Sequence, residues 1–136
     1  MKTRSIRQTV TFYAEPVRVY DALMDSRKHA EFTGSAASIS RKVHGQIKAY
    51  DGLIEGTNVE LEPGRRIVQS WISKEKCWPD GHFSRVTFSF KKVRKGTRLS
   101  FFQSGVPEKC YATIRNGWWD AYWNPMKKMF AEQQTA

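Results

Sequence analysis

The last third of the sequence contains a segment so rich in large apolar side chains that it restricts the folds open to the chain. Residues 117–130 read GWWDAYWNPMKKMF and contain three tryptophans, a tyrosine, two methionines and a phenylalanine. On a helix from about Lys109 to Glu132, at about 100° per residue, these side chains fall within an arc of roughly 140°. Polar residues such as Asp120 and Lys127 fall on the other side. A helix with one wide apolar face needs a second layer, so we predict a long C-terminal helix packed against a sheet.

The preceding sequence supplies the strands for that sheet. In residues 83–93, Val86 and Phe88 alternate with Arg85 and Thr87, which is the period of a half-buried strand. Two short helices are predicted after the first strand, one opening at Pro16 and one near residues 27–32. Further strands are predicted at residues 5–13, 38–43, 46–50, 54–62, 66–73 and 97–104. This order predicts an α+β domain with the helices on one face of an antiparallel sheet.

Length and charge limit the organisation and the partners. The 136 residues suit one domain over residues 1–136, and the 40% hydrophobic content argues against disorder. The net charge of +10 favours acidic partners. Because the basic residues occur in small scattered groups, ordinary solvated surface charge is the main interpretation, and a polyanion site is the alternative. No nucleic-acid-binding motif is present.

The cysteines and histidines predict neither a metal site nor a cofactor. Cys77 and Cys110 form no CxxC pair, and the three histidines show no metal-ligand spacing with them. The N-terminus lacks the apolar stretch of a signal peptide, and no run of residues approaches transmembrane length. We therefore expect a soluble, reduced, cytoplasmic protein without a membrane span.

The aromatic helix face has two interpretations. It can close a solid core, or it can bridge across a curved sheet and leave a cavity for an apolar ligand. Pro125 is expected to remove one backbone hydrogen bond and to kink the helix. Arg115 either extends to water from the helix start or lies at a pocket mouth, where it would pair with a ligand carboxylate. The predicted cavity-lining residues are Trp118, Trp119, Tyr122, Trp123, Met126, Met129, Phe130, Trp71, Val86, Phe88, Phe101, His82 and Arg115.

Several strings along the chain resemble one known family. They are VYDALMD (19–25), YDGLIEG (50–56), ELEPGRRIVQSW (60–71), WPDGHFSRVTFSF (78–90), LSFFQSGVP (99–107) and RNGWWDAYW (115–123). In this order they resemble the C-terminal domain of the activator of the heat-shock protein 90 ATPase, a branch of the START-like (SRPBCC) superfamily. The resemblance implies a helix-grip fold, in which a curved antiparallel sheet of about six to seven strands wraps around a long C-terminal helix.

Two departures from the family bear on function. The usual double glycine before the second strand block is His44-Gly45 here. The eukaryotic activator also carries a separate N-terminal domain that tethers it to the chaperone, whereas this chain begins directly at the first strand. The resemblance thus implies the fold more directly than it implies a co-chaperone role.

Three functions remain open. The first is a non-enzymatic module that binds a hydrophobic or amphipathic small molecule between the C-terminal helix and the sheet. The second is a co-chaperone that contacts or stimulates a heat-shock protein 90-type ATPase. The third, a cyclase-like enzyme acting on a hydrophobic substrate, is not favoured, because no triad or paired acids are present and a single inward histidine such as His82 is usually structural. No catalytic residue is predicted.

Overall fold

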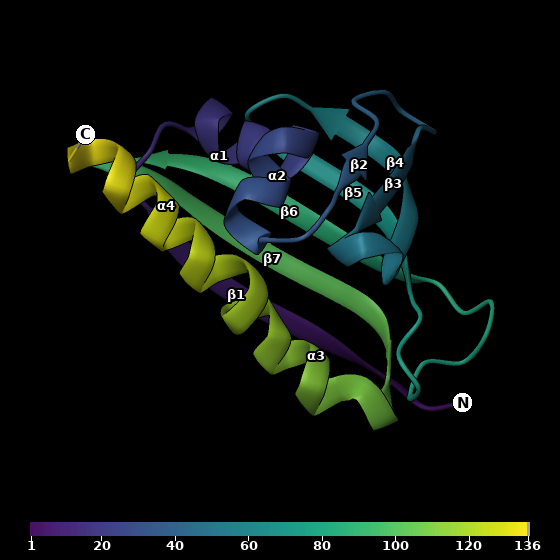
Figure 1. Cartoon of the computed structure of the whole chain (residues 1–136). Coiled ribbons are helices and arrows are strands. Elements are labelled where there is room, and N and C mark those ends of the chain that lie inside the picture. The colour runs from purple at the N-terminus through teal and green to yellow at the C-terminus, as the bar shows by residue number, and fades with distance from the viewer. Residues whose placement is uncertain (136) are drawn as a thin grey trace.

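Among residues 1–135, which the computed structural model describes, seven antiparallel strands form a sheet that curves around a long C-terminal helix (Figure 1). The strands are β1 (Thr3–Phe12), β2 (Ser38–Ile39), β3 (Gln46–Ala49), β4 (Ile54–Glu62), β5 (Arg66–Ser73), β6 (Ser84–Val93) and β7 (Gly96–Pro107). The helices are α1 (Pro16–Met24), α2 (Ser26–Thr33), α3 (Tyr111–Trp118) and α4 (Asn124–Thr135), with short helical turns η1 (Tyr50–Gly52), η2 (Glu108–Cys110) and η3 (Trp119–Trp123). The predicted helix-grip architecture is confirmed.

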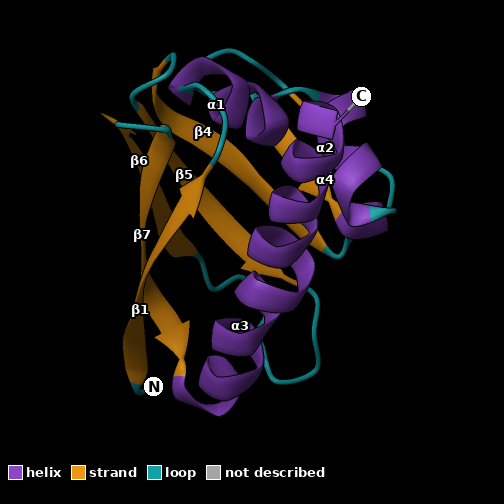
Figure 2. Cartoon of the chain, turned by 90° about the vertical axis from the view of Figure 1, so that its left-hand side faces the viewer, coloured by secondary structure: helices purple, strands orange, loops and turns teal. Residues whose placement is uncertain are grey.

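The sheet has the strand order β1-β7-β6-β5-β4-β3-β2. Strands β2 to β7 follow one another as a meander, and β1 returns to pair with β7, so the first and last strands lie side by side. The sheet forms one layer, and the helices form the other (Figure 2). The concave face of the sheet is therefore the only sheet face that the described helices cover.

The core follows the predicted alternation. Val86 and Phe88 of β6 have 0% and 1% exposure, while Arg85, which precedes Val86, is exposed. On the adjacent strand, Leu99 and Phe101 are buried in the same way. These side chains pack against the long helix, because only the covered face of the sheet excludes water.

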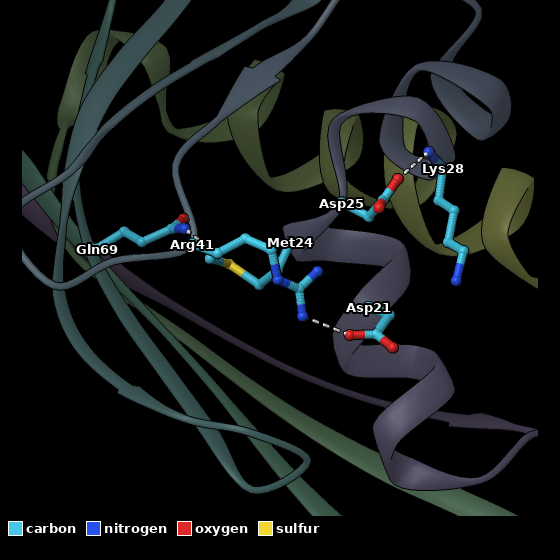
Figure 3. A network of polar contacts seen from close by, with 6 residues as sticks. All are labelled: Asp21, Met24, Asp25, Lys28, Arg41 and Gln69. Atoms are coloured by element: carbon cyan, nitrogen blue, oxygen red, sulfur yellow. Dashed lines mark hydrogen bonds and ion pairs between the residues drawn. The ribbon is translucent and has the colours of Figure 1, made fainter.

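Polar contacts fix the two short helices (Figure 3). Asp25 caps α2: its carboxylate accepts a hydrogen bond from the backbone N–H of Lys28 at 3.0 Å, and this bond lowers the pKa of Asp25. Arg41 pairs with Asp21 of α1 at 2.7 Å and so ties the loop after β2 to that helix. Because this pair is exposed, its contribution to stability is at most about 1 kcal/mol.

The segment between α2 and β4 differs from the predicted strands. The strand predicted at residues 38–43 is limited to Ser38–Ile39. The hairpin predicted at Asp51-Gly52 is confirmed, because β3 and β4 pair antiparallel with Ala49 opposite Ile54. Its connection is a helical turn in which Tyr50, Asp51 and Gly52 all have positive φ (51°, 57° and 91°). The Asp51 carboxylate accepts a hydrogen bond from the backbone N–H of Ala36 at 2.7 Å. This contact links the turn to the loop between α2 and β2.

The backbone at His44-Gly45 bears on the double glycine that the family resemblance implies there. His44 has φ of 69°, in the left-handed region that favours glycine. A Cβ at Gly45 would lie 1.9 Å from Ser40 Oγ, so a side chain at that position would require Ser40 to move. Steric contact therefore requires glycine at position 45, whereas position 44 only favours glycine through its φ angle.

His44→Gly is expected to raise the free energy of unfolding by about 0.5–1 kcal/mol, because relief of the left-handed strain exceeds the entropy cost of glycine. Urea unfolding measures the change. The control is Lys42→Gly in the same exposed turn, where φ is not positive and glycine should destabilise. Equal effects of the two substitutions would contradict the strain explanation.

The prediction of reduced cysteines is wrong. Cys77 and Cys110 form a disulfide across 33 residues, with Cα atoms 5.5 Å apart. The sequence spacing hides this proximity, because β7 continues through Gly105 to Pro107 and delivers Cys110 to the loop before β6. Disulfides are rare in reducing compartments, so the expected cytoplasmic location stays a prediction. No helix within residues 1–135 is long and apolar enough to cross a membrane.

Candidate functional site

The C-terminal helix is interrupted by a π-helical turn. In η3 the backbone N–H of Asn124 bonds to the carbonyl of Trp119, five residues earlier. Pro125 follows directly and has no N–H to offer the carbonyl of Ala121, four residues before it. The hydroxyl of Tyr50 donates to that carbonyl at 2.5 Å. The irregularity expected at Pro125 is thus a π turn, and it links the helix to η1.

The C-terminal half of the aromatic face closes a solid core. Trp123 and Met126 have 0% exposure and Phe130 has 3%. The ring of Trp123 lies 5.5 Å from that of Phe101, and its indole N–H donates to the side chain of Gln8 at 2.7 Å. The interpretation of the face as core packing therefore describes this half of the helix.

The N-terminal half of the face borders a pocket of about 270 Å³ between α3, the ends of β4 and β5, and the loop before β6. We call it the α3 pocket. Its walls are mostly aromatic and aliphatic side chains, and it has a few polar residues. They are Tyr50, Leu53, Ile54, Trp71, Ile72, Ser73, Glu75, Trp78, Gln103, Thr113, Ile114, Gly117, Trp118, Ala121 and Tyr122.

The polar atoms of the three pocket tryptophans are all occupied elsewhere. The indole N–H of Trp71 donates to Gln69 at 2.8 Å, and that of Trp118 donates to Gln103 at 2.8 Å. The indole N–H of Trp78 donates to the backbone carbonyl of His82 at 2.6 Å. These side chains therefore offer a ligand ring surfaces rather than hydrogen bonds, which favours apolar molecules.

Comparison with known proteins identifies the family. A family model described as "Activator of Hsp90 ATPase homolog 1-like protein" matches residues 13–131. The chain belongs to this family. The resemblance noted in the sequence is confirmed.

Named relatives and a solved structure agree with this assignment. The activator of 90 kDa heat shock protein ATPase homolog of Dictyostelium discoideum is 30% identical over 117 residues, which are 85% of this chain and 30% of the relative. Homolog 1 of Homo sapiens is 28% identical over 120 residues, 88% of this chain and 35% of the relative. The chain thus spans about a third of the length of these relatives. The crystal structure of an HSP90 activator from Plasmodium falciparum has the same fold, with a TM-score of 0.83, 24% identity, and coverage of 93% of this chain and 96% of that one.

In this member of the activator family, the predicted lining residues from the sheet and the long helix divide into three groups. Trp71, Trp118 and Tyr122 border the α3 pocket. Trp119 is half-buried beside Lys127, and Met129 borders a separate surface hollow of about 490 Å³ between α2 and α4. The others among the sheet and helix residues are core: Val86, Phe88, Phe101, Trp123, Met126 and Phe130.

Arg115 and His82 lie outside the α3 pocket. Arg115 is exposed, with its guanidinium 5.4 Å from the ring of Tyr111. The ideal helical wheel misplaced it, because the π turn puts an extra residue between Arg115 and the core half of the helix. His82 lies in the loop, where its Nε2 is 2.6 Å from the carbonyl of Gly105. It supports the loop that carries Trp78.

The sequence did not indicate several residues of the pocket. Tyr50 and Leu53 lie in the connection of the β3–β4 hairpin and Trp78 lies in the connection between β5 and β6, as predicted, but these positions alone do not indicate a pocket. Gly117 on α3 leaves open space where its side chain would be. The positive φ of Tyr50 is the backbone feature that turns its side chain toward the helix, and burial raises its pKa to about 12.

Tyr122, which borders the α3 pocket, makes a buried contact with His29, which does not border it. The Nε2 atom of His29 lies 2.9 Å from the hydroxyl of Tyr122, and its Nδ1 atom has no hydrogen-bond partner among the described residues. Burial lowers the pKa of His29 from 6.5 to about 4 and raises the pKa of Tyr122. Within residues 1–135 no cluster of three His, Cys, Asp or Glu side chains could hold a metal ion.

The shifted pKa of His29 predicts a loss of stability in mild acid. Between pH 6.5 and about 4, the unfolded chain binds a proton at His29 that the folded chain does not bind. The free energy of unfolding therefore reaches its full value above pH 6.5, and protonation of His29 in the unfolded chain lowers it by about 2 kcal/mol at pH 5. Urea unfolding at pH 7.5 and pH 5 measures this difference. His29→Gln should show a smaller pH dependence, and an unchanged one would contradict the assignment.

Proposed function

We propose that the chain is a binding module that holds an apolar or amphipathic small molecule in the α3 pocket. The observation that carries this proposal is a space of about 270 Å³ walled by aromatic rings whose indole N–H groups are bonded elsewhere. Its volume is near the lower end for ligand pockets, which suits a small ligand. The binding energy would come mainly from apolar area removed from water.

Gly117 provides a test of this proposal. Because a Cβ there meets no atom within 4 Å, Gly117→Ala should raise the free energy of unfolding by about 0.5–1 kcal/mol through helix propensity, and it should leave most of the pocket open. Gly117→Phe should fill the pocket without disturbing the solid core. The measurements are urea unfolding and tryptophan fluorescence during titration with small aromatic alcohols and short fatty acids.

The expected result is binding by the parent chain and by Gly117→Ala, and loss of binding in Gly117→Phe. Thermal unfolding of the phenylalanine variant checks that it remains folded. If no compound binds the parent chain, or if Gly117→Phe binds equally well, the proposal is refuted.

A co-chaperone role is the second candidate, and family membership favours it. Relatives over this region are named activators of the 90 kDa heat shock protein ATPase. The charge of +10 suits an acidic surface on such a partner. We expect the chain to increase ATP turnover by a heat-shock protein 90-type ATPase of the same organism, with an effect that weakens as salt rises. No stimulation and no binding at low salt would exclude this role.

A cyclase-like activity stays a prediction from the fold resemblance alone. The α3 pocket contributes one carboxylate, Glu75, and two tyrosines whose hydroxyls contact Ala121 and His29. This arrangement gives no specific support for a reaction.

A further inference from the structure

The α3 pocket has one charged side chain in its lining. Glu75 lies in the loop after β5, half-buried, and borders the same space as Trp71 and Trp118. The lining contains no lysine, arginine or histidine. On a chain with a net charge of +10, the pocket therefore carries the opposite charge to the protein as a whole.

The carboxylate of Glu75 has no cationic partner within the part of the chain that the structure describes. The ion pairs found in residues 1–135 involve other acids. The ammonium of the preceding Lys74 is bound to Glu55 at 3.1 Å. The nearest recorded side-chain contact of Glu75 is Cys77 Sγ at 4.0 Å, and a disulfide sulfur has no hydrogen to donate. The carboxylate is thus free to accept a ligand group.

The aromatic walls favour the same sign of ligand charge. Trp71, Trp118 and Tyr122 all border the pocket. Their rings also pack on one another, with the ring of Trp118 5.0 Å from that of Trp71 and 4.6 Å from that of Tyr122. Aromatic faces carry partial negative charge and attract ammonium groups, with tryptophan the most effective. A carboxylate beside such faces is a combination suited to an organic cation.

We propose that the α3 pocket selects organic ammonium ions with an apolar body. The body would pack against the sides of Trp71 and Trp118 that border the pocket, and the ammonium would meet the carboxylate of Glu75. This inference rests on the proposed binding function and reverses the ligand charge expected from Arg115, which lies outside the pocket. The net positive charge opposes a cation at long range, but salt screens it beyond about 8 Å at about 0.15 M.

Three probes with one skeleton test the charge preference: 4-phenylbutylammonium, 4-phenylbutan-1-ol and 4-phenylbutanoate. Their dissociation constants are measured at neutral pH by tryptophan fluorescence. The ammonium is expected to bind about fivefold more tightly than the alcohol, and the carboxylate more weakly than both. Glu75→Gln should remove the preference for the ammonium and leave the affinity for the alcohol unchanged. Glu62→Gln, at an exposed position outside the lining, should behave like the parent chain.

The outcomes separate this inference from the proposed function. If the alcohol binds but the ammonium binds no better, or if Glu75→Gln keeps the preference, the charge selection is refuted while the apolar binding function stands. If none of the three probes binds the parent chain, both are refuted.

Discussion

Trp123→Ala is expected to lower the free energy of unfolding by about 4 kcal/mol. The side chain has 0% exposure and contacts the rings of Phe12, Phe88 and Phe101, so its removal leaves a cavity where the helix meets the sheet. It also leaves the side-chain oxygen of Gln8 without its indole donor. Urea unfolding at neutral pH measures the change.

Trp119→Ala is the matched control, because it removes the same side chain from the same π turn. Trp119 is only half-buried, and its recorded ring contact is with Lys127. Its loss should cost about 1 kcal/mol. Similar losses for the two variants would contradict the assignment of Trp123 to the solid core and of Trp119 to the edge of the helix face.

Loss of the Cys77–Cys110 disulfide is expected to lower the free energy of unfolding by about 3–4 kcal/mol. The bond closes a loop across 33 residues, and in the chain-entropy description a loop of this length gives that stabilisation. The bond also fixes the loop that carries Glu75 and Trp78, so its loss should weaken ligand binding in the α3 pocket. Urea unfolding with and without a thiol reductant measures the stability.

The double variant Cys77→Ser with Cys110→Ala provides the control for this prediction. It should have the stability of the reduced parent chain and should not respond further to reductant. A parent chain that unfolds at the same urea concentration with and without reductant would show that the disulfide does not contribute as described.

Much of the sheet could be predicted because its signal is local. The alternation of Val86 and Phe88 with Arg85 reports directly which face of β6 is covered. The run 66–73 was predicted with the bounds that β5 has, since the Pro63-Gly64 turn stands just before it. The long helix was visible for the same reason, because its apolar face is wide.

Features that depend on contacts between distant segments could not be predicted in this way. The π turn changes which residues share a face, so a wheel with equal steps put Arg115 among the apolar residues. The disulfide depends on where β7 ends, which the spacing of Cys77 and Cys110 does not report. Gly117 leaves space for the pocket because it has no side chain. A search of the sequence for large apolar residues therefore does not find it.

The candidate site was therefore only partly visible in the sequence. The predicted face correctly placed Trp118 and Tyr122 toward the sheet, but most of its other large residues fill the core. The opposite wall comes from η1, β4, β5 and the loop before β6, which the fold brings together across more than twenty residues of sequence.

The most direct test of the binding proposal is a ¹H–¹⁵N spectrum of the indole N–H groups during titration with 4-phenylbutan-1-ol. The chain has five tryptophans, of which Trp71, Trp78 and Trp118 border the α3 pocket. We predict that these three resonances shift with one dissociation constant, that the resonance of Trp119 does not move, and that Gly117→Phe abolishes the shifts. Five unchanged resonances, or the same shifts in Gly117→Phe, would contradict the account.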